Sequence, residues 1–186
     1  MKRIELVYNR ILEEAMENKN YKLTQKKLST ELKISLSTVN YALKPLRNIG
    51  AIKVNLKNFN VISIKKILFY WASTRNFEKD IIYRLRVDKP VTEIEKNMPN
   101  SAIFTAYSYY KFKFKDAPAD YSEVYVYSNK EDIQKRFKEI KGPPNLFVLK
   151  KDINRLSLAN LFVDLWNLKE WYAKDYLQAL ENKLKI

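Results

Sequence analysis

The chain has 186 residues, of which 46% are hydrophobic and 30% charged, and its formal net charge is +14. It contains no cysteine and no histidine, which excludes disulfide bonds, thiol or imidazole catalysis and metal sites built on these side chains. Its two glycines, Gly50 and Gly142, are too far apart for a phosphate-binding loop or a dinucleotide-binding motif, so no cofactor is expected.

The segment from Asn18 to Lys66 contains eleven lysines and arginines and one acidic residue, Glu31. A nucleic-acid backbone is the natural counter-surface for this density of positive charge. No run of 18 apolar residues occurs, and the first residues lead into a charged amphipathic segment rather than a signal peptide. We therefore expect a cytoplasmic protein with no membrane partner.

Three helices are predicted in the first fifty residues. Apolar side chains recur at helical spacing over residues 3–17, which indicates the first. Thr24 is placed to cap a second helix and Ser35 a third, with Ile34 at the corner between them. Gly50 then supplies the positive φ with which helices commonly end.

The third of these helices is expected to bind DNA. Its apolar residues at i, i+4 and i+7 point inward, so the opposite face carries hydroxyls, an amide, an aromatic ring and a cation. The candidate DNA-binding residues of this helix and its cap are Ser35, Ser37, Thr38, Asn40, Tyr41 and Lys44.

A hairpin is predicted to follow. Residues 52–57 alternate between apolar and polar, residues 58–60 have turn chemistry, and residues 61–64 run back. Lys53 and Lys57 on this wing are placed to touch a DNA backbone or minor groove. The whole pattern predicts a winged helix-turn-helix over residues 1–66 that binds double-stranded DNA. Some winged helices bind protein or RNA instead, or only dimerise, but the local charge favours DNA.

Residues 67–186 are predicted to form a compact mixed α/β domain, so the fold class is α+β. Thr92 to Glu95 indicates a capping box, and Tyr110 to Lys115 alternates strictly between aromatic residues and lysines, as in an edge strand. The expected helices are 65–75, a short one at 92–98, 101–110, 130–141, 156–166 and 169–185, and the expected strands are 81–87, 110–115, 123–127 and 145–149.

The last two helices carry more aromatic side chains than one buried stripe needs, which favours a homodimer contact through Trp166, Trp171, Tyr172 and Tyr176. No catalytic or metal-binding residues are assigned. A nucleotidyltransferase needs a Gly-Ser turn and an Asp-x-Asp motif, and neither occurs. Asp116, Asp120 and Glu123 could form an acidic cluster for a catalytic alternative, although Asp120 is better suited to cap or turn the chain before the next strand. A replication or plasmid initiator is a further alternative.

The chain resembles the AbiEi-type antitoxin and transcriptional-regulator families of bacteria and archaea. The likeness rests on residues 23–50, 68–73, 118–127 and 158–166. The resemblance implies a promoter-binding autorepressor, with a toxin as partner in some members. It also implies that DNA is contacted by residues at the positions of Ser37, Thr38, Asn40, Tyr41 and Lys44.

Overall fold

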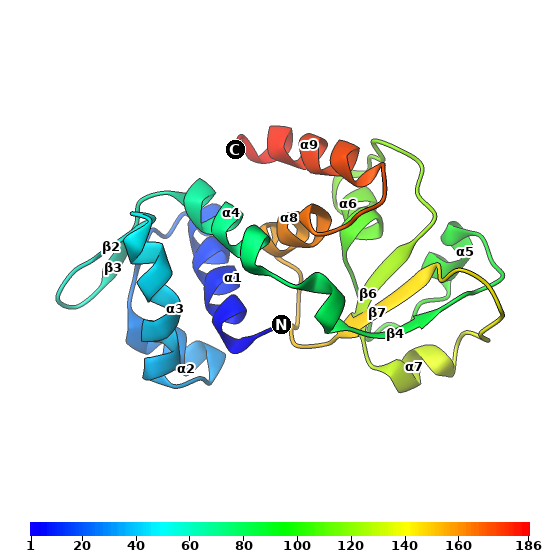
Figure 1. Ribbon diagram of the computed structural model, residues 1–186, viewed down its shortest axis with the longest axis horizontal. Coiled ribbons are helices and arrows are strands. Elements are labelled where there is room, and N and C mark those ends of the chain that lie inside the picture. Colours follow the sequence, from blue (N-terminus) through cyan, green and yellow to red (C-terminus); the bar gives the residue numbers. More distant parts are fainter. The chain divides into compact units, whose positions relative to one another are not determined.

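The computed structural model describes all residues from 1 to 186. It divides into two compact units (Figure 1). The N-terminal unit contains residues 1–75 and 157–163, and the C-terminal unit contains residues 76–156 and 164–186. The domain boundary expected after residue 66 lies inside a helix, α4 (Ile64–Thr74), and the N-terminal unit continues to Arg75.

Four complete helices, part of a fifth (residues 158–163) and a small sheet build the N-terminal unit. The helices are α1 (Arg3–Met16), α2 (Gln25–Leu32), α3 (Leu36–Asn48) and α4. The sheet is antiparallel with the order β1 (Lys22–Leu23), β3 (Phe59–Val61), β2 (Ile52–Val54). The helix-turn-helix and the wing are thus confirmed, whereas β1 was not predicted.

The core of this unit comes from the apolar stripes that the sequence indicated. Ile11 of α1, Val39 and Leu46 of α3, and Trp71 of α4 are all completely buried. Burial of each such side chain contributes about 1.5–3 kcal/mol. Phe162, from the distant end of the chain, packs edge-on against Phe69 of α4 at 5.6 Å between ring centroids, which explains why residues 157–163 belong to this unit.

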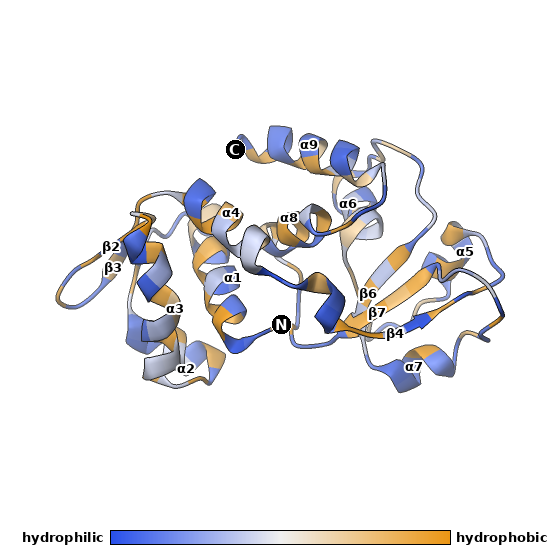
Figure 2. Cartoon of the chain, in the orientation of Figure 1, coloured by the Kyte–Doolittle hydropathy of each residue, from blue (hydrophilic) through white to orange (hydrophobic).

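A four-stranded sheet forms the centre of the C-terminal unit. Its order is β4 (Ile81–Leu85), β7 (Leu146–Lys150), β6 (Val124–Ser128), β5 (Ile103–Phe104), and only β6 and β7 are parallel. Figure 2 shows β7 as predominantly hydrophobic, as expected for an inner strand. The helical elements are η1 (Phe77–Asp80), α5 (Val91–Lys96), α6 (Ala106–Phe114), α7 (Lys130–Gln134), α8 (Leu158–Trp166) and α9 (Ala173–Leu184). Residues 158–163 of α8 belong to the N-terminal unit.

Both faces of this sheet are covered, so β6 is buried along its whole length. Val124 and Val126 belong to one apolar cluster together with Ile94 of α5 and Ile133 of α7. Tyr125, which points to the other face, stacks on Phe147 at 4.6 Å and 14°. The mixed α+β fold class is therefore confirmed.

The prediction of a strand over residues 110–115 is wrong, because these residues form the last part of helix α6 and its C-cap. Tyr107, Tyr110 and Phe114 share one face of that helix, and the first two are completely buried. Tyr110 packs edge-on against Tyr176 of α9 at 5.3 Å. The helical spacing that begins before residue 110 outweighs the local alternation.

Two further predictions of local structure are wrong. The helix expected over residues 130–141 ends at Gln134, because the amide of Ile140 donates to the carbonyl of Arg86 (3.0 Å) and draws the chain against the sheet edge. The capping box at residues 92–95 does not form, since α5 already begins at Val91 after Pro90 and has no side-chain cap.

Of the four aromatic side chains expected to form a surface on the last two helices, only two are exposed. Tyr172 and Tyr176 are 5% and 0% exposed and pack around Tyr107, so they belong to the core of the C-terminal unit. Trp166 and Trp171 are 40% and 73% exposed. No helix in the structure combines the length and the apolar character that crossing a lipid bilayer requires.

Candidate nucleic-acid interface

Hydroxyl side chains cap the starts of both helices of the helix-turn-helix, α2 and α3. Thr24 accepts a hydrogen bond from the amide of Lys27 (3.1 Å), and Ser35 accepts one from the amide of Thr38 (3.2 Å). Each cap satisfies an amide that the helix itself leaves unpaired, which is worth about 1 kcal/mol. Lys33 ends α2 with φ 52° and turns the chain toward α3. The caps predicted at both helices are confirmed.

The face of α3 that is turned to solvent carries most of the candidate residues. Ser37, Asn40, Tyr41 and Lys44 are exposed, and the exposed fraction of Tyr41 is 63%. Thr38 is only partly exposed, and its hydroxyl lies 2.8 Å from that of Ser35. Ser35 and Thr38 therefore form the start of the helix, while the other four side chains face outward together.

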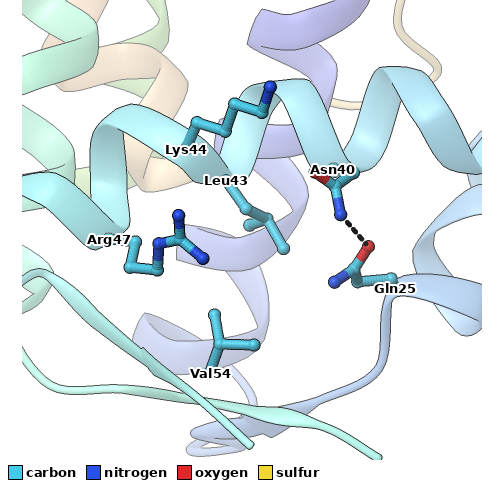
Figure 3. A pocket seen from close by; sticks show the side chains of 6 residues that line it. All are labelled: Gln25, Asn40, Leu43, Lys44, Arg47 and Val54. Carbon is cyan, nitrogen blue, oxygen red and sulfur yellow. Dashed lines mark hydrogen bonds between the residues drawn. The ribbon is translucent and has the colours of Figure 1, made fainter. Parts of the chain in front are cut away.

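Asn40 is held by a residue that the sequence reading did not single out. Its Nδ2 donates to Oε1 of Gln25, the first residue of α2, at 3.4 Å. The two amides line a small pocket of about 40 Å³, drawn in Figure 3. Its six lining residues are Gln25, Asn40, Leu43, Lys44, Arg47 and Val54.

Arg47 is a second cation of this face that was overlooked. It lies seven residues, or two turns, after Asn40, so that both side chains belong to the same edge of α3 and line the same pocket (Figure 3). Helical spacing alone could have identified it. Figure 3 also shows the ammonium of Lys44 pointing away from Asn40 and Arg47.

The turn of the wing begins three residues earlier than predicted, at residue 55 instead of residue 58. The amide of Asn55 donates to the carbonyl of Asn58 (2.8 Å), and the Nδ2 of Asn55 donates to the Oδ1 of Asn58 (3.0 Å), so residues 55–58 form the turn. Lys53 and Lys57 are exposed as predicted, and Leu56 at the tip is completely open to solvent. A hollow of about 270 Å³ lies between this turn and the starts of α2 and α3.

No carboxylate lines either of these two cavities. Glu31, the one acidic residue of the basic segment, is paired with Arg10 of α1 at 2.9 Å and with Lys27 at 3.7 Å. The positive charges of Lys44, Arg47 and the wing lysines therefore act on this surface without a lining carboxylate to oppose them. Such a surface attracts polyanions.

The acidic residues considered for catalysis have different surroundings. Asp116 is exposed and pairs with Lys183 at 3.6 Å. Burial and the nearby charge of Glu170 raise the pKa of Glu123. No group of three or more acidic side chains is arranged so that it could hold a metal ion.

Comparison with known proteins agrees with the geometry of the N-terminal unit. Residues 9–53 match the family model of the winged helix-turn-helix DNA-binding domains. No curated protein and no solved structure gave a match. The matched segment runs from α1 through the helix-turn-helix into β2, and it includes every candidate residue except Lys57.

Proposed function

We propose that this protein is a transcriptional regulator that recognises a specific sequence in double-stranded DNA. The N-terminal unit contains a winged helix-turn-helix DNA-binding domain, and in this fold the third helix enters the major groove. The observation that carries the proposal is the exposed face of α3. It presents Asn40 and Tyr41 between cations, and no carboxylate lines the pockets beside it.

The proposed roles divide into base reading and backbone binding. Asn40 offers a carboxamide, which can pair with N6 and N7 of adenine, and Tyr41 and Ser37 lie beside it on the same face. Lys44, Lys53 and Lys57 supply charge for phosphates, which position a protein on DNA without reading its sequence. Ser35 and Thr38 act at the start of α3, where the helix amides that the cap leaves unpaired can bind a phosphate.

We further propose that the protein is an autorepressor of the AbiEi antitoxin type. The support is the resemblance over residues 23–50, 68–73, 118–127 and 158–166, together with a C-terminal unit of mixed α/β structure that follows the DNA-binding domain. In this proposal the C-terminal unit has no catalytic role and serves to dimerise or to bind a cognate toxin. The site of action is the chromosome in the cytoplasm.

Enrichment of sheared genomic DNA on the purified protein, followed by sequencing, tests the proposal. We expect a small number of enriched sites, one of which lies at the promoter of the protein's own gene. The control is the variant Asn40→Ala/Tyr41→Ala, whose two side chains are exposed, so that folding is preserved while the enriched sites are lost. Enrichment at an origin instead of a promoter would indicate an initiator, and no enrichment would contradict DNA recognition.

A further inference from the structure

A third pocket borders the exposed face of α3, on the edge opposite to the small pocket beside Asn40. It has a volume of about 300 Å³ and is formed by α1, α3 and α4. We call it the tyrosine pocket. Its lining residues are Ile4, Tyr8, Tyr41, Lys44, Pro45, Asn48 and Tyr70. Lys44 lines both this pocket and the small pocket beside Asn40, so the two cavities flank one exposed stripe of the helix.

The polar groups of the tyrosine pocket are suited to donate hydrogen bonds. Three phenols, one ammonium and one carboxamide line it, and no carboxylate does. Glu5 of α1 lies near Tyr8, but it forms an ion pair with Arg75 at 3.5 Å. The pocket therefore favours a ligand that carries negative charge and accepts several hydrogen bonds.

Tyr8 and Tyr70 lie side by side at the pocket. Their rings pack edge-on at 5.8 Å, and Tyr8 is 2% exposed. Burial, the nearby Tyr70 and the hydrogen bond to it raise the pKa of Tyr8 above its ordinary value of 10, so Tyr8 stays protonated. One hydrogen bond between the two phenols uses only one of their two protons, and the other is left for a ligand.

The location of the pocket indicates where the anion comes from. A helix in the major groove has one DNA strand passing along each of its sides. The wing carries Lys53 and Lys57, and Val54 between them lines the small pocket on the Asn40 side of α3. The tyrosine pocket is on the other side, next to Tyr41 and Asn48. Its apolar walls, Ile4 and Pro45, suit a sugar beside the phosphate.

We propose that the tyrosine pocket binds a phosphodiester of the DNA backbone, on the strand opposite to the one that meets the wing. Lys44 supplies the charge, and Tyr70, Asn48 and Tyr41 donate hydrogen bonds to the phosphate oxygens. This site rests on the proposed function, since it needs a duplex seated on α3. It would fix the rotation of the helix in the groove and thereby the register in which Asn40 meets a base.

The test combines Tyr70→Phe with single methylphosphonate substitutions, which remove the charge of one phosphate at a time. Tyr70→Phe deletes one hydroxyl and keeps the ring that packs on Tyr8. We expect it to weaken binding of the enriched DNA site roughly tenfold, as for one hydrogen bond to a charged group. Tyr83→Phe in the C-terminal unit, which loses a hydroxyl bonded to Glu139, is the matched control and should leave affinity unchanged.

The expected result is one phosphate position at which the two changes are not additive. With methylphosphonate there, Tyr70→Phe should lower affinity less than twofold further, while at all other positions its full effect should remain. Asn48 is exposed, so Asn48→Ala should leave the fold intact, and it should be non-additive with methylphosphonate at the same phosphate position. Agreement between the two variants would show that the effect of Tyr70→Phe is not caused by a folding defect.

Two results would overturn the proposal. The first is additivity at every position, and the second is an effect of Tyr83→Phe equal to that of Tyr70→Phe. If the scan is additive, binding of free inorganic phosphate, detected by the ring signals of Tyr70, would indicate a site for a free anion instead. Failure of the proposed function is distinguishable, because the unmodified protein would then bind no DNA site in preference to random duplex.

Discussion

Asn40 of α3 donates a hydrogen bond from its Nδ2 to the Oε1 of Gln25 at the start of α2 (3.4 Å). This contact orients the carboxamide of Asn40, so that its Oδ1 and its second Nδ2 hydrogen are left for a base edge. It also leaves the Nε2 of Gln25 free to donate beside it. Under the proposed function, α2 thereby helps to set which base Asn40 of α3 recognises.

Asn40→Ala should cost about 1–3 kcal/mol of binding free energy at one base pair of the operator and nothing at the others. Asn40 is exposed, so the change removes a base contact without opening a cavity. Binding to a set of operators with single base changes measures this. An equal loss on random DNA would assign Asn40 to a phosphate and contradict base reading.

Gln25→Ala should relax specificity at the same base pair, because Asn40 loses its orienting acceptor. A double-mutant cycle with Asn40→Ala should then give a coupling energy of at least about 0.5 kcal/mol. Thr30→Ala on the same helix is the control, since Thr30 is exposed and does not line the small pocket. Strict additivity of Gln25→Ala and Asn40→Ala would show that the pair does not act as a unit.

Lys53→Ala and Lys57→Ala should weaken binding to all sequences alike, because wing lysines are expected to meet the backbone. Each should also reduce the slope of log affinity against log salt by about one.

For the unaltered protein, about six neutralised phosphates predict a loss of roughly 10³ in affinity between 50 and 200 mM salt. Salt titrations by fluorescence anisotropy check this, with Lys89→Ala in the C-terminal unit as control. An affinity that does not change with salt concentration would contradict binding through phosphate contacts.

The N-terminal unit should lose stability in acid through Glu14. Burial by itself would raise the pKa of Glu14, but hydrogen bonds from Asn20 (2.6 Å) and Asn18 (3.0 Å) and the charge of Arg10 outweigh it and hold the pKa below 4.5. A lowered pKa stabilises the folded state above pH 4.5, and this stabilisation disappears as the pH falls through the folded-state pKa.

Glu14→Gln should therefore be less stable than the unaltered protein at neutral pH, and the difference should shrink below pH 4.5. Urea unfolding followed by circular dichroism over a pH series measures this. Glu93→Gln, in which the replaced carboxylate is exposed and pairs only loosely with Lys89 at 3.4 Å, is the control and should show almost no change. If the difference in free energy of unfolding between Glu14→Gln and the unaltered protein stays constant with pH, the account is contradicted.

Dimerisation in solution remains a prediction, now restricted to the two exposed tryptophans. Trp171 is 73% exposed and Trp166 40%, and both belong to the C-terminal unit. Exposed aromatic side chains of this kind frequently anchor interfaces. Light scattering at micromolar concentration should give twice the chain mass of 22.2 kDa, and Trp171→Ser should restore the monomer mass. A mass near 22.2 kDa for the unaltered protein would rule out a stable dimer.

The N-terminal unit was largely predictable because its signals are local. Caps at Thr24 and Ser35, apolar residues at helical spacing and a positive φ at Gly50 (+65°) each require only a few neighbouring residues. The contact between Asn40 and Gln25 joins residues 15 apart on two helices, and no local pattern indicates it. The strand β1 was missed for a similar reason, since its two residues pair with β3 nearly forty positions later.

Predictions for the C-terminal unit were correct where a strand is buried on both sides and wrong where distant contacts decide. The strands at β6 and β7 follow from apolar runs. The segment of residues 110–115 alternates like a strand, yet it is helical because Tyr107 and Tyr110 meet Tyr176 from the other end of the unit. The same contacts bury Tyr176, which the sequence alone placed on a dimer surface.

The most direct test of the central claim is the specificity ratio of the protein, measured as its affinity for the enriched genomic site relative to random duplex of equal length at 150 mM salt. A winged helix-turn-helix that reads bases through α3 should prefer its site by roughly 10³ or more, and Asn40→Ala should lower that ratio while leaving affinity for random DNA unchanged. Equal affinity for the two duplexes would contradict the account, since α3 would then bind DNA by charge alone.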